Sequence, residues 1–395
     1  MTNLLPPEIL GNILCRLTVK DLLRCRSVSR SWCSLVDGPD FIKHHLNRSI
    51  STSRNLGLVL NARDRDLYWL DLDTLLSPVR LSQLPIVNDD DGDGIEILGC
   101  CNGVLALGNS YGFMALWNPS TRKYRNLSYS DVIEFPSRGV VDFGATGFGY
   151  DSVNDDYKLV RVVLFIDMDL DCFPTEVKVY SVKANAWKTV SDFPCYYGYQ
   201  RVKGVLVNGA LHWLVSKKPE CDSLFLIVAF DLVNEQCREV PVPSYDDKYF
   251  YVKIGELGGC LSLVKNYNPD NNSVRVEIWV MKEYGIKESW TMLFSLMPSH
   301  TSGSFSYAEN VAYFESSDRV LLDLGGEMFV LYDLKTKTVE NLRIFGVPKF
   351  FEARLCVGSL VGFDGGDADN KTTRKQEEDG NNRKRQKHQK GGKKR

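Results

Sequence analysis

Apolar residues recur at helical spacing along the first fifty residues, a pattern that predicts three or four short helices. Pro6 and Pro7 suit the first turn of a helix, where amide donors have no intrahelical partner, so the first helix is expected to begin there. Its apolar face consists of Ile9, Leu10, Ile13, Leu14 and Leu17. Thr18, with Asp21 three residues later, resembles a capping box and predicts the start of a second helix.

A third helix is predicted from the apolar positions Val28, Trp32, Leu35 and Val36. Gly38 is expected to end it, and a fourth helix is expected from Asp40 to about Leu46. A module of roughly forty residues is marginal without a disulfide, a metal or a partner, and this one has neither disulfide nor metal-ligand spacing. A partner helix therefore explains the leftover apolar stripe better than solvent does. The alternative is a helical cap on a larger domain, and Trp32 fits either the module's core or a partner contact.

From Leu56 onward, short β-branched and aromatic runs alternate with turns, which is typical of an all-β domain. One pattern recurs: a strand that ends in a large apolar residue, a polar residue, a turn and another strand. The copies lie at Leu70-Asp71, Trp117-Asn118, Tyr180-Ser181, Phe230-Asp231, Trp279-Val280-Met281-Lys282 and Tyr332-Asp333, and the fifth departs at its polar position. Their spacings of 47, 63, 50, 49 and 53 residues suit four-stranded kelch-like blades.

These spacings predict a β-propeller of about six blades, because each blade has edges and an apolar face that only ring closure covers. A pair of β-sandwiches with fortuitous spacing is the alternative. The interval of 63 residues contains residues 136–141 and 167–174, which are expected to be insertions in loops. Five tryptophans are expected to fill space between blades: Trp117, Trp187, Trp213, Trp279 and Trp290.

Two sets of motifs resemble known families. The N-terminal segments L-P-x-E-x-L from Leu5, D-L-L-R-C from Asp21 and V-S-R-x-W from Val28 resemble the F-box. The body resembles the F-box-associated domain of plant F-box proteins through Gly99-Cys100-Cys101-Asn102-Gly103, Gly147-Phe148-Gly149-Tyr150-Asp151 and Gly209-Ala210-Leu211-His212-Trp213. The resemblance implies an F-box over residues 1–48, a kelch-like propeller over 56–363 and a tail over 364–395.

The resemblance also implies partners. An F-box binds a Skp-type adaptor and, through it, a cullin ubiquitin ligase, and this contact would fall on Leu5, Pro6, Leu14, Asp21, Leu22, Arg24 and Trp32. The propeller would hold a protein for ubiquitination and proteasomal degradation. Family targets range from immune receptors to pollen-incompatibility ribonucleases, so an immune receptor is one candidate. Tyrosine is favoured at interface centres, so aromatic candidates for target contact, with ordinary blade packing as the alternative, are Tyr196, Tyr197, Tyr199, Tyr249, Phe250 and Tyr251.

The bulk composition fits a folded, unsecreted protein. The 395 residues are 44% hydrophobic and 25% charged, enough for a real core. No signal-peptide pattern opens the chain, and the longest apolar run, residues 224–230, is far too short to span a bilayer. The eleven cysteines are scattered and odd in number, so most are expected to be reduced and buried.

The C-terminal tail carries a charge opposite to that of the body. Residues 380–395 hold eight Lys or Arg and no acid, so the rest of the chain has a net charge of −10. With no apolar residues to bury, the tail is expected to be disordered. A nuclear import signal is predicted at Lys371, Arg374, Lys375, Arg383, Lys384, Arg385 and Lys387. The expected location is therefore nucleus and cytoplasm, and a solubilising tail or a nucleic-acid patch is the alternative.

Candidate chemistry in the body is sparse. Asp89, Asp91 and Asp93 match half a calcium loop, but Cys100 stands where the bidentate Glu would be, so an acidic surface loop is expected. The glycines at 144, 147 and 149 lack the Lys and helix of a phosphate loop and are interpreted as a hairpin turn. His212 lies beside Trp213 in an apolar strand and is expected to be a hydrogen-bonded core histidine.

We therefore expect no catalytic residue, no metal site and no cofactor. The sequence predicts a non-catalytic substrate receptor, which acts by holding its target near a charged conjugating enzyme. Two other classes stay open: a nuclear scaffold without ligase function, and a propeller enzyme with His, Tyr or carboxylate ligands in its central channel.

Overall fold

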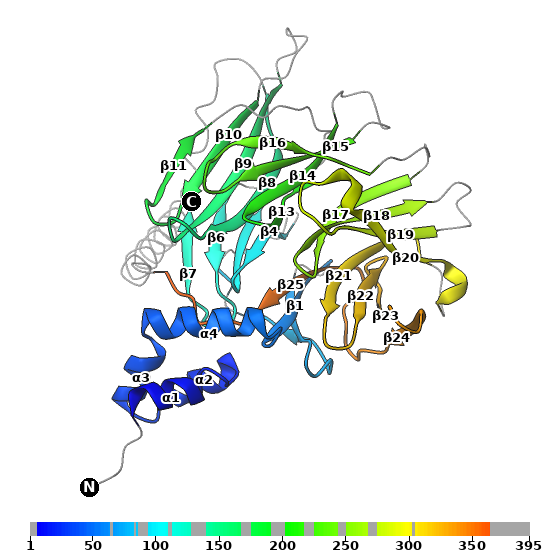
Figure 1. The fold of residues 1–395 in the computed structure, drawn as a ribbon. Coiled ribbons are helices and arrows are strands. Elements are labelled where there is room, and N and C mark those ends of the chain that lie inside the picture. Colours follow the sequence, from blue (N-terminus) through cyan, green and yellow to red (C-terminus); the bar gives the residue numbers. More distant parts are fainter. Residues whose placement is uncertain are drawn as a thin grey trace, which may run out of the picture.

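Four helices precede a ring of six β-sheets in the computed structural model (Figure 1). The structure describes residues 6–63, 66–82, 84–85, 94–109, 113–127, 140–166, 175–190, 202–216, 225–243, 250–267, 275–301 and 305–363. The predicted helical module and six-bladed propeller are confirmed. The predicted tail lies outside the described residues.

Three of the four helices begin where the sequence predicts. They are α1 (Pro7–Leu14), α2 (Val19–Cys25), α3 (Arg30–Val36) and α4 (Pro39–Ser51). The Thr18 hydroxyl caps α2 by accepting a hydrogen bond from the backbone N–H of Asp21 at 3.2 Å. Two expectations were wrong: Val28 precedes α3 and is 63% exposed, and α4 continues past Leu46 to Ser51. Leu46 of α4 is buried against the propeller, a tertiary contact with no local sequence signal.

Each blade is a sheet of four main strands. Blade 1 contains β25 (Phe351–Val357), β1 (Leu56–Ala62), β2 (Leu67–Asp71) and β3 (Val79–Arg80). Blade 2 contains β4 (Ile95–Cys101), β5 (Val104–Asn109), β6 (Met114–Trp117) and β7 (Tyr124–Leu127). Blade 3 contains β8 (Val140–Asp151), β9 (Asp156–Ile166), β10 (Thr175–Ser181) and β11 (Ala186–Thr189), and β12 (Val202–Lys203) pairs parallel to β8.

The remaining blades follow the same order. Blade 4 contains β13 (Val205–Val207), β14 (Ala210–Ser216), β15 (Phe225–Asp231) and β16 (Cys237–Val240). Blade 5 contains β17 (Phe250–Leu257), β18 (Cys260–Tyr267), β19 (Arg275–Met281) and β20 (Trp290–Leu296). Blade 6 contains β21 (Ala308–Phe314), β22 (Arg319–Leu324), β23 (Met328–Asp333) and β24 (Thr338–Leu342). Two short 3-10 helices flank β20, η1 (Lys287–Ser289) and η2 (Pro298–His300).

The recurring sequence pattern marks the end of the third strand in every blade. Its polar residue closes the following turn: the Asp231 carboxylate accepts hydrogen bonds from the backbone N–H groups of Val233 and Asn234, both at 2.8 Å. Asp71, Asn118 and Asp333 bond the turns of their own blades in the same way. The fifth copy departs because Val280, which follows Trp279, has no such oxygen, and η1 follows β19 instead.

The predicted glycine turn at residues 144–149 was wrong, because all of it lies inside the long strand β8. A side chain at Gly147 would meet Leu211 at 2.9 Å and Trp213 at 3.0 Å. Blade 4 therefore packs closely on this strand, and the glycines allow that approach. Most of the predicted insertions, residues 136–139 and 167–174, lie outside the described residues.

A buried apolar cluster fills the space between each pair of neighbouring blades. Trp117 and Trp213 are fully buried in two of them, and Trp290 is 7% exposed in a third. Trp187 and Trp279 are half-buried. Trp187 packs against a further cluster, and Trp279 packs against the cluster that contains Trp290. The expected role of these tryptophans between blades is confirmed, most fully for the first three.

β25 closes the ring, and the segment that follows it attaches the helices to the propeller. β25 pairs with β1 along seven residues, from Leu56 opposite Val357 to Ala62 opposite Phe351. The segment after β25 turns into the helical module, where Leu360 is 7% exposed within the helices' own core. From blade 2, the Asn118 amide donates hydrogen bonds to the carbonyls of Ser359 at 3.0 Å and Val361 at 2.8 Å.

The Leu360→Ala substitution is expected to destabilise the helical module by about 2–5 kcal/mol, since it leaves a cavity in a small core. Hydrogen exchange of α1 to α3 should accelerate while exchange in the blades stays unchanged. Leu76→Ala, at a leucine that is 71% exposed, is the matched control. Equal protection of α1 to α3 in both variants would contradict the assignment of Leu360 to the helical core.

Candidate protein-binding sites

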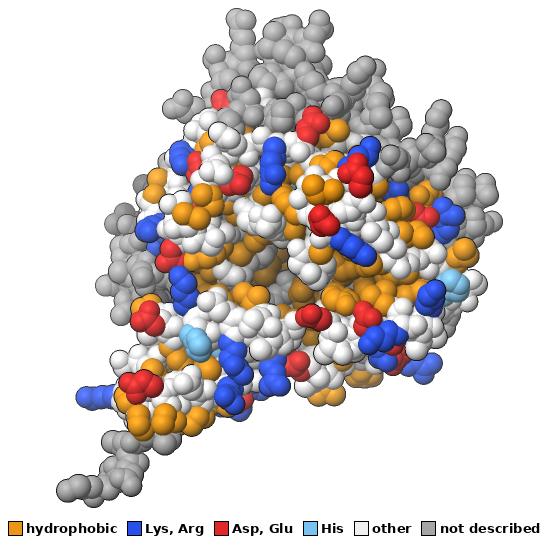
Figure 2. All heavy atoms as spheres, in the orientation of Figure 1, with side chains coloured by type: hydrophobic (Ala, Val, Ile, Leu, Met, Phe, Trp, Pro, Cys, Tyr) orange, Lys and Arg blue, Asp and Glu red, His pale blue; other side chains and the backbone are white. Residues whose placement is uncertain are grey.

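The helical module divides its apolar residues between an internal core and an exposed face. Leu14, Val19, Leu22, Val36 and Phe41 are buried together with Leu360. In contrast, Ile9 and Ile13, one helical turn apart on α1, are each 48% exposed. Figure 2 shows hydrophobic side chains gathered at the lower end of the module, where Figure 1 places α1.

The predicted adaptor residues fall into different environments. Leu5 lies outside the described residues, and Leu14 and Leu22 are 2% and 0% exposed, so the structure gives these two a packing role and does not present them at the surface. Pro6 is exposed at the N-cap of α1. Trp32 is half-buried against the helical core. Adaptor contact by these residues therefore stays a prediction. Within this module, only the exposed side chains are accessible to an adaptor.

The two polar residues predicted to contact the adaptor, Asp21 and Arg24, interact with each other in α2. The Thr18 hydroxyl donates to the Asp21 carboxylate at 2.8 Å, and Arg24 forms an ion pair with the same carboxylate at 3.2 Å. The Arg24 side chain is 69% exposed, so this pair adds little stability and leaves the guanidinium accessible. Ile9 and Ile13 were absent from the predicted contacts, although the same apolar stripe contains them. The signal that distinguishes them is their offset from Leu10 and Leu14, which face inward.

Tyr251 is the only predicted target-binding aromatic whose side chain the structure describes. Tyr196, Tyr197, Tyr199 and Tyr249 lie outside the described residues, and Phe250 begins β17. The Tyr251 side chain is 52% exposed, and the Lys253 ammonium lies 5.7 Å from its ring centroid. Its role in target contact stays a prediction.

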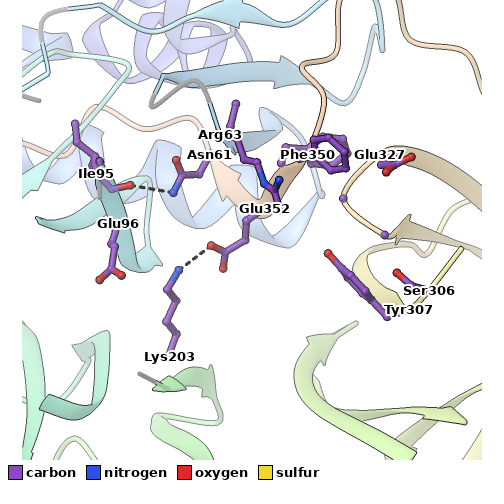
Figure 3. Close-up of a pocket in the computed structure, with 15 residues that line it drawn as sticks. Asn61, Arg63, Ile95, Glu96, Lys203, Ser306, Tyr307, Glu327, Phe350 and Glu352 are labelled. Carbon is purple, nitrogen blue, oxygen red and sulfur yellow. Dashed lines mark hydrogen bonds and ion pairs between the residues drawn. The ribbon is translucent and has the colours of Figure 1, made fainter. Parts of the chain in front are cut away.

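A pocket of about 740 Å³ opens at one mouth of the propeller channel, and we call it the channel-mouth pocket. Side chains that line it include Asn61, Arg63, Glu96, Lys203, Tyr307 and Glu352, from blades 1, 2, 3 and 6 (Figure 3). β1 starts beside the helices and ends at this pocket, and β25 starts at the pocket and ends beside the helices. The pocket therefore lies at the end of the ring away from the helical module.

An ion-pair cluster includes Glu352 and Lys203, two of the residues that line the pocket. Glu352 on β25 pairs with Lys203 on β12 at 2.7 Å and also with Arg354. Burial raises the pKa of the Glu352 carboxyl, but Arg354 and Lys203 outweigh it and lower that pKa to about 2. On the far wall, Lys253 pairs with Glu309.

Asp323, close behind the pocket wall, behaves differently from Glu352. It is 3% exposed and accepts a hydrogen bond from the backbone N–H of Gly326 at 2.8 Å. Burial, together with the nearby Glu309 charge, raises its pKa to about 8. Asp323 is therefore largely protonated and uncharged at neutral pH.

The candidates for catalysis and metal binding have other roles or fall outside the described chain. No group of three or more His, Cys, Asp or Glu within the described ranges could hold a metal ion. The possible calcium-loop residues Asp89, Asp91 and Asp93 and the basic tail lie outside those ranges. His212 is fully buried, and its Nδ1 and Nε2 lie 3.1 Å from the Val205 carbonyl and 2.6 Å from the Tyr284 hydroxyl. It is the hydrogen-bonded core histidine that the sequence predicted.

Family comparisons match both parts of the chain. The model described as F-box domain matches residues 3–44, and the model described as F-box associated beta propeller domain matches residues 59–354. A helical F-box module joined to a propeller defines the class, and the chain belongs to the plant F-box proteins that carry an F-box-associated propeller domain. No described helix is long and apolar enough to cross a membrane.

Three relatives from Arabidopsis thaliana show the extent of the similarity. The F-box protein CPR1 is 38% identical over 394 residues, which cover 94% of this chain and 92% of the relative. The F-box protein At4g22390 is 31% identical and covers 90% of each chain. The F-box/kelch-repeat protein At3g23880 is 31% identical over 74% of this chain and 79% of its own.

His212 should make stability depend on pH. Burial lowers its pKa to about 4, so below the ordinary value of about 6.5 the unfolded chain takes up a proton that the folded chain excludes. The contribution of His212 to stability is full above pH 6.5 and falls as pH drops toward 4, by on the order of 2 kcal/mol at pH 5. Urea unfolding of the wild type and His212→Gln at pH 7.5 and pH 5 measures it, with exposed His44→Gln as control. A pH dependence that His212→Gln leaves unchanged would refute this account.

Proposed function

We propose that the chain is the substrate-recognition subunit of a Skp-cullin-F-box ubiquitin ligase. The F-box would dock on a Skp-type adaptor, and the propeller would hold a protein target for ubiquitination and proteasomal degradation. The observation that carries this proposal is the placement of two surfaces at opposite ends of the molecule. Exposed isoleucines of α1 lie at one end, and the channel-mouth pocket opens at the other.

The role we infer needs no catalytic side chain in this chain. F-box proteins are generally substrate adaptors rather than enzymes, and a receptor speeds transfer by proximity. The rigid attachment of the helices through Leu360 and Asn118 supports this role, since it fixes the direction in which a bound target faces. Which protein is bound is left to experiment, and an immune receptor is a candidate through family resemblance.

The proposal is tested by affinity capture of the full chain with the proteasome blocked. Adaptor, cullin and target should be recovered together, and target abundance should rise when the chain is removed. Recovery of partners without adaptor and cullin would instead support a nuclear scaffold without ligase function.

Replacing Ile9 and Ile13 together by Asp should abolish adaptor binding while the propeller stays folded. Each isoleucine would contribute roughly 1.4 kcal/mol or more of apolar burial, so the pair should weaken binding by about 100-fold. Co-purification with adaptor measures the loss, and thermal unfolding checks the propeller. The control is Val153→Asp, which places the same charge at an exposed apolar residue of blade 3. Undiminished adaptor binding by the double variant would reject α1 as the contact.

Nuclear localisation through the basic tail is also part of the proposal. Deleting residues 371–395 should move the protein from nucleus to cytoplasm, as measured by fluorescence microscopy of a tagged chain. The matched control replaces the seven predicted basic residues by Gln and keeps the tail length. An unchanged distribution in both variants would leave solubilisation as the role of the tail.

A further inference from the structure

We propose that the channel-mouth pocket binds a carboxylate of the target protein, between Arg63 and Lys203. This inference rests on the proposed function, that the propeller holds a protein target. The carboxylate would come from an Asp or Glu side chain or from the target's C-terminus. The pocket volume of about 740 Å³ is large enough for a short peptide segment.

Arg63 is held in place for such an interaction. Its guanidinium lies over the Phe350 ring at 4.5 Å, and its backbone N–H donates to the Phe350 carbonyl at 3.1 Å. Within the part of the chain that the structure describes, no carboxylate lies at ion-pair distance from this guanidinium. A stacked guanidinium keeps its fork of N–H donors free, and that fork matches a carboxylate with two parallel hydrogen bonds.

Lys203 is not the only cation that neutralises Glu352. Glu352 is paired with both Lys203 and Arg354, so two cations share one carboxylate. A ligand carboxylate can therefore bind Lys203 while Arg354 still neutralises Glu352. No buried charge is left unpaired by this exchange, which would otherwise cost several kcal/mol.

The other acidic groups around the pocket set where a ligand carboxylate fits. Glu309 is paired with Lys253, and Asp323 lies buried behind the wall. Glu96 and Glu327 contribute carboxylates from blades 2 and 6 (Figure 3). They repel a second acidic residue, so the pocket should select one acid with uncharged neighbours.

The test uses the full chain co-purified with adaptor and three pools of fluorescent octapeptides. Each pool carries one central Glu, Gln or Lys among uncharged residues. Each pool is prepared in two forms, one with a free C-terminus and one with an amidated C-terminus. Fluorescence anisotropy should show the Glu pool binding about tenfold tighter than the Gln pool. If a target's C-terminus is the source, the free-acid form should bind instead, and amidation should remove the binding.

Two substitutions of opposite sign separate a charge-specific site from a structural one. Lys203→Gln and Arg63→Gln should each weaken binding of the acidic peptides by about tenfold. Glu352→Gln should strengthen it several-fold, because it releases Lys203. Lys335→Gln, an exposed lysine in the β23–β24 turn, is the control and should have no effect.

Several outcomes would overturn the inference: preference for the Lys pool, no discrimination among pools, no binding by any pool, or effects of the same direction in Lys203→Gln and Glu352→Gln. Adaptor co-purification is measured on the same samples. Intact adaptor binding with failed peptide binding rejects this site alone, whereas loss of adaptor from the wild-type chain rejects the proposed function.

Discussion

The pairing of β25 with β1 is the interaction on which the rest of the structure depends. A propeller has apolar faces between all of its blades, and the first and last blades cover one another only if the ring closes. Here β25, the last of the described strands, forms the edge of the blade 1 sheet beside β1, with seven residues in antiparallel register. Every other blade is built from consecutive strands, so this is the one step that requires the two ends of the domain to meet.

Ring closure also determines the state of the helical module. The residues that follow β25 continue directly into that module, where Gly358 N–H donates to the Asn55 carbonyl at 2.7 Å and Leu360 enters the core. A helical module of this size is only marginally stable alone. The residues that follow β25 cover part of its apolar core. After this internal packing, the isoleucines of α1 are still exposed to a partner.

Local features of the fold followed from the sequence because short-range chemistry decides them. Thr18 caps α2, and the repeated polar residue closes the turn after the third strand of each blade where its oxygen is present. The glycines at 144–149 were assigned wrongly because the same composition suits a turn or a tightly packed strand. The difference lies in Leu211 and Trp213, some sixty residues away in the sequence, which no local pattern shows.

The candidate sites show the same limit more strongly. Lys203 and Glu352 are separated by 149 residues, and they meet only because β12 and β25 both line the channel. Likewise, the sequence assigned Leu14 and Leu22 to the adaptor because the family motif contains them, but helix packing turns both inward. Ile9 and Ile13 have the same helical period, but they are offset by one residue from Leu10 and Leu14 and face solvent.

The arrangement of charges suggests why the channel end suits binding better than the blade junctions do. Between blades 3 and 4, Lys158 is 5% exposed and paired with Asp151 at 2.8 Å and Glu235 at 2.9 Å. Removing one of these three charged groups would leave its partners buried and uncompensated, which is strongly destabilising. These ion pairs therefore have a structural role. Around the channel mouth, Lys203, Glu352 and Arg354 are 23%, 32% and 35% exposed, and Glu352 has two cationic partners. Exchange of a partner is inexpensive there, whereas the ring of apolar clusters keeps the backbone fixed. A rigid frame with exchangeable charges at one mouth discriminates among ligands by charge without having to reorganise the fold.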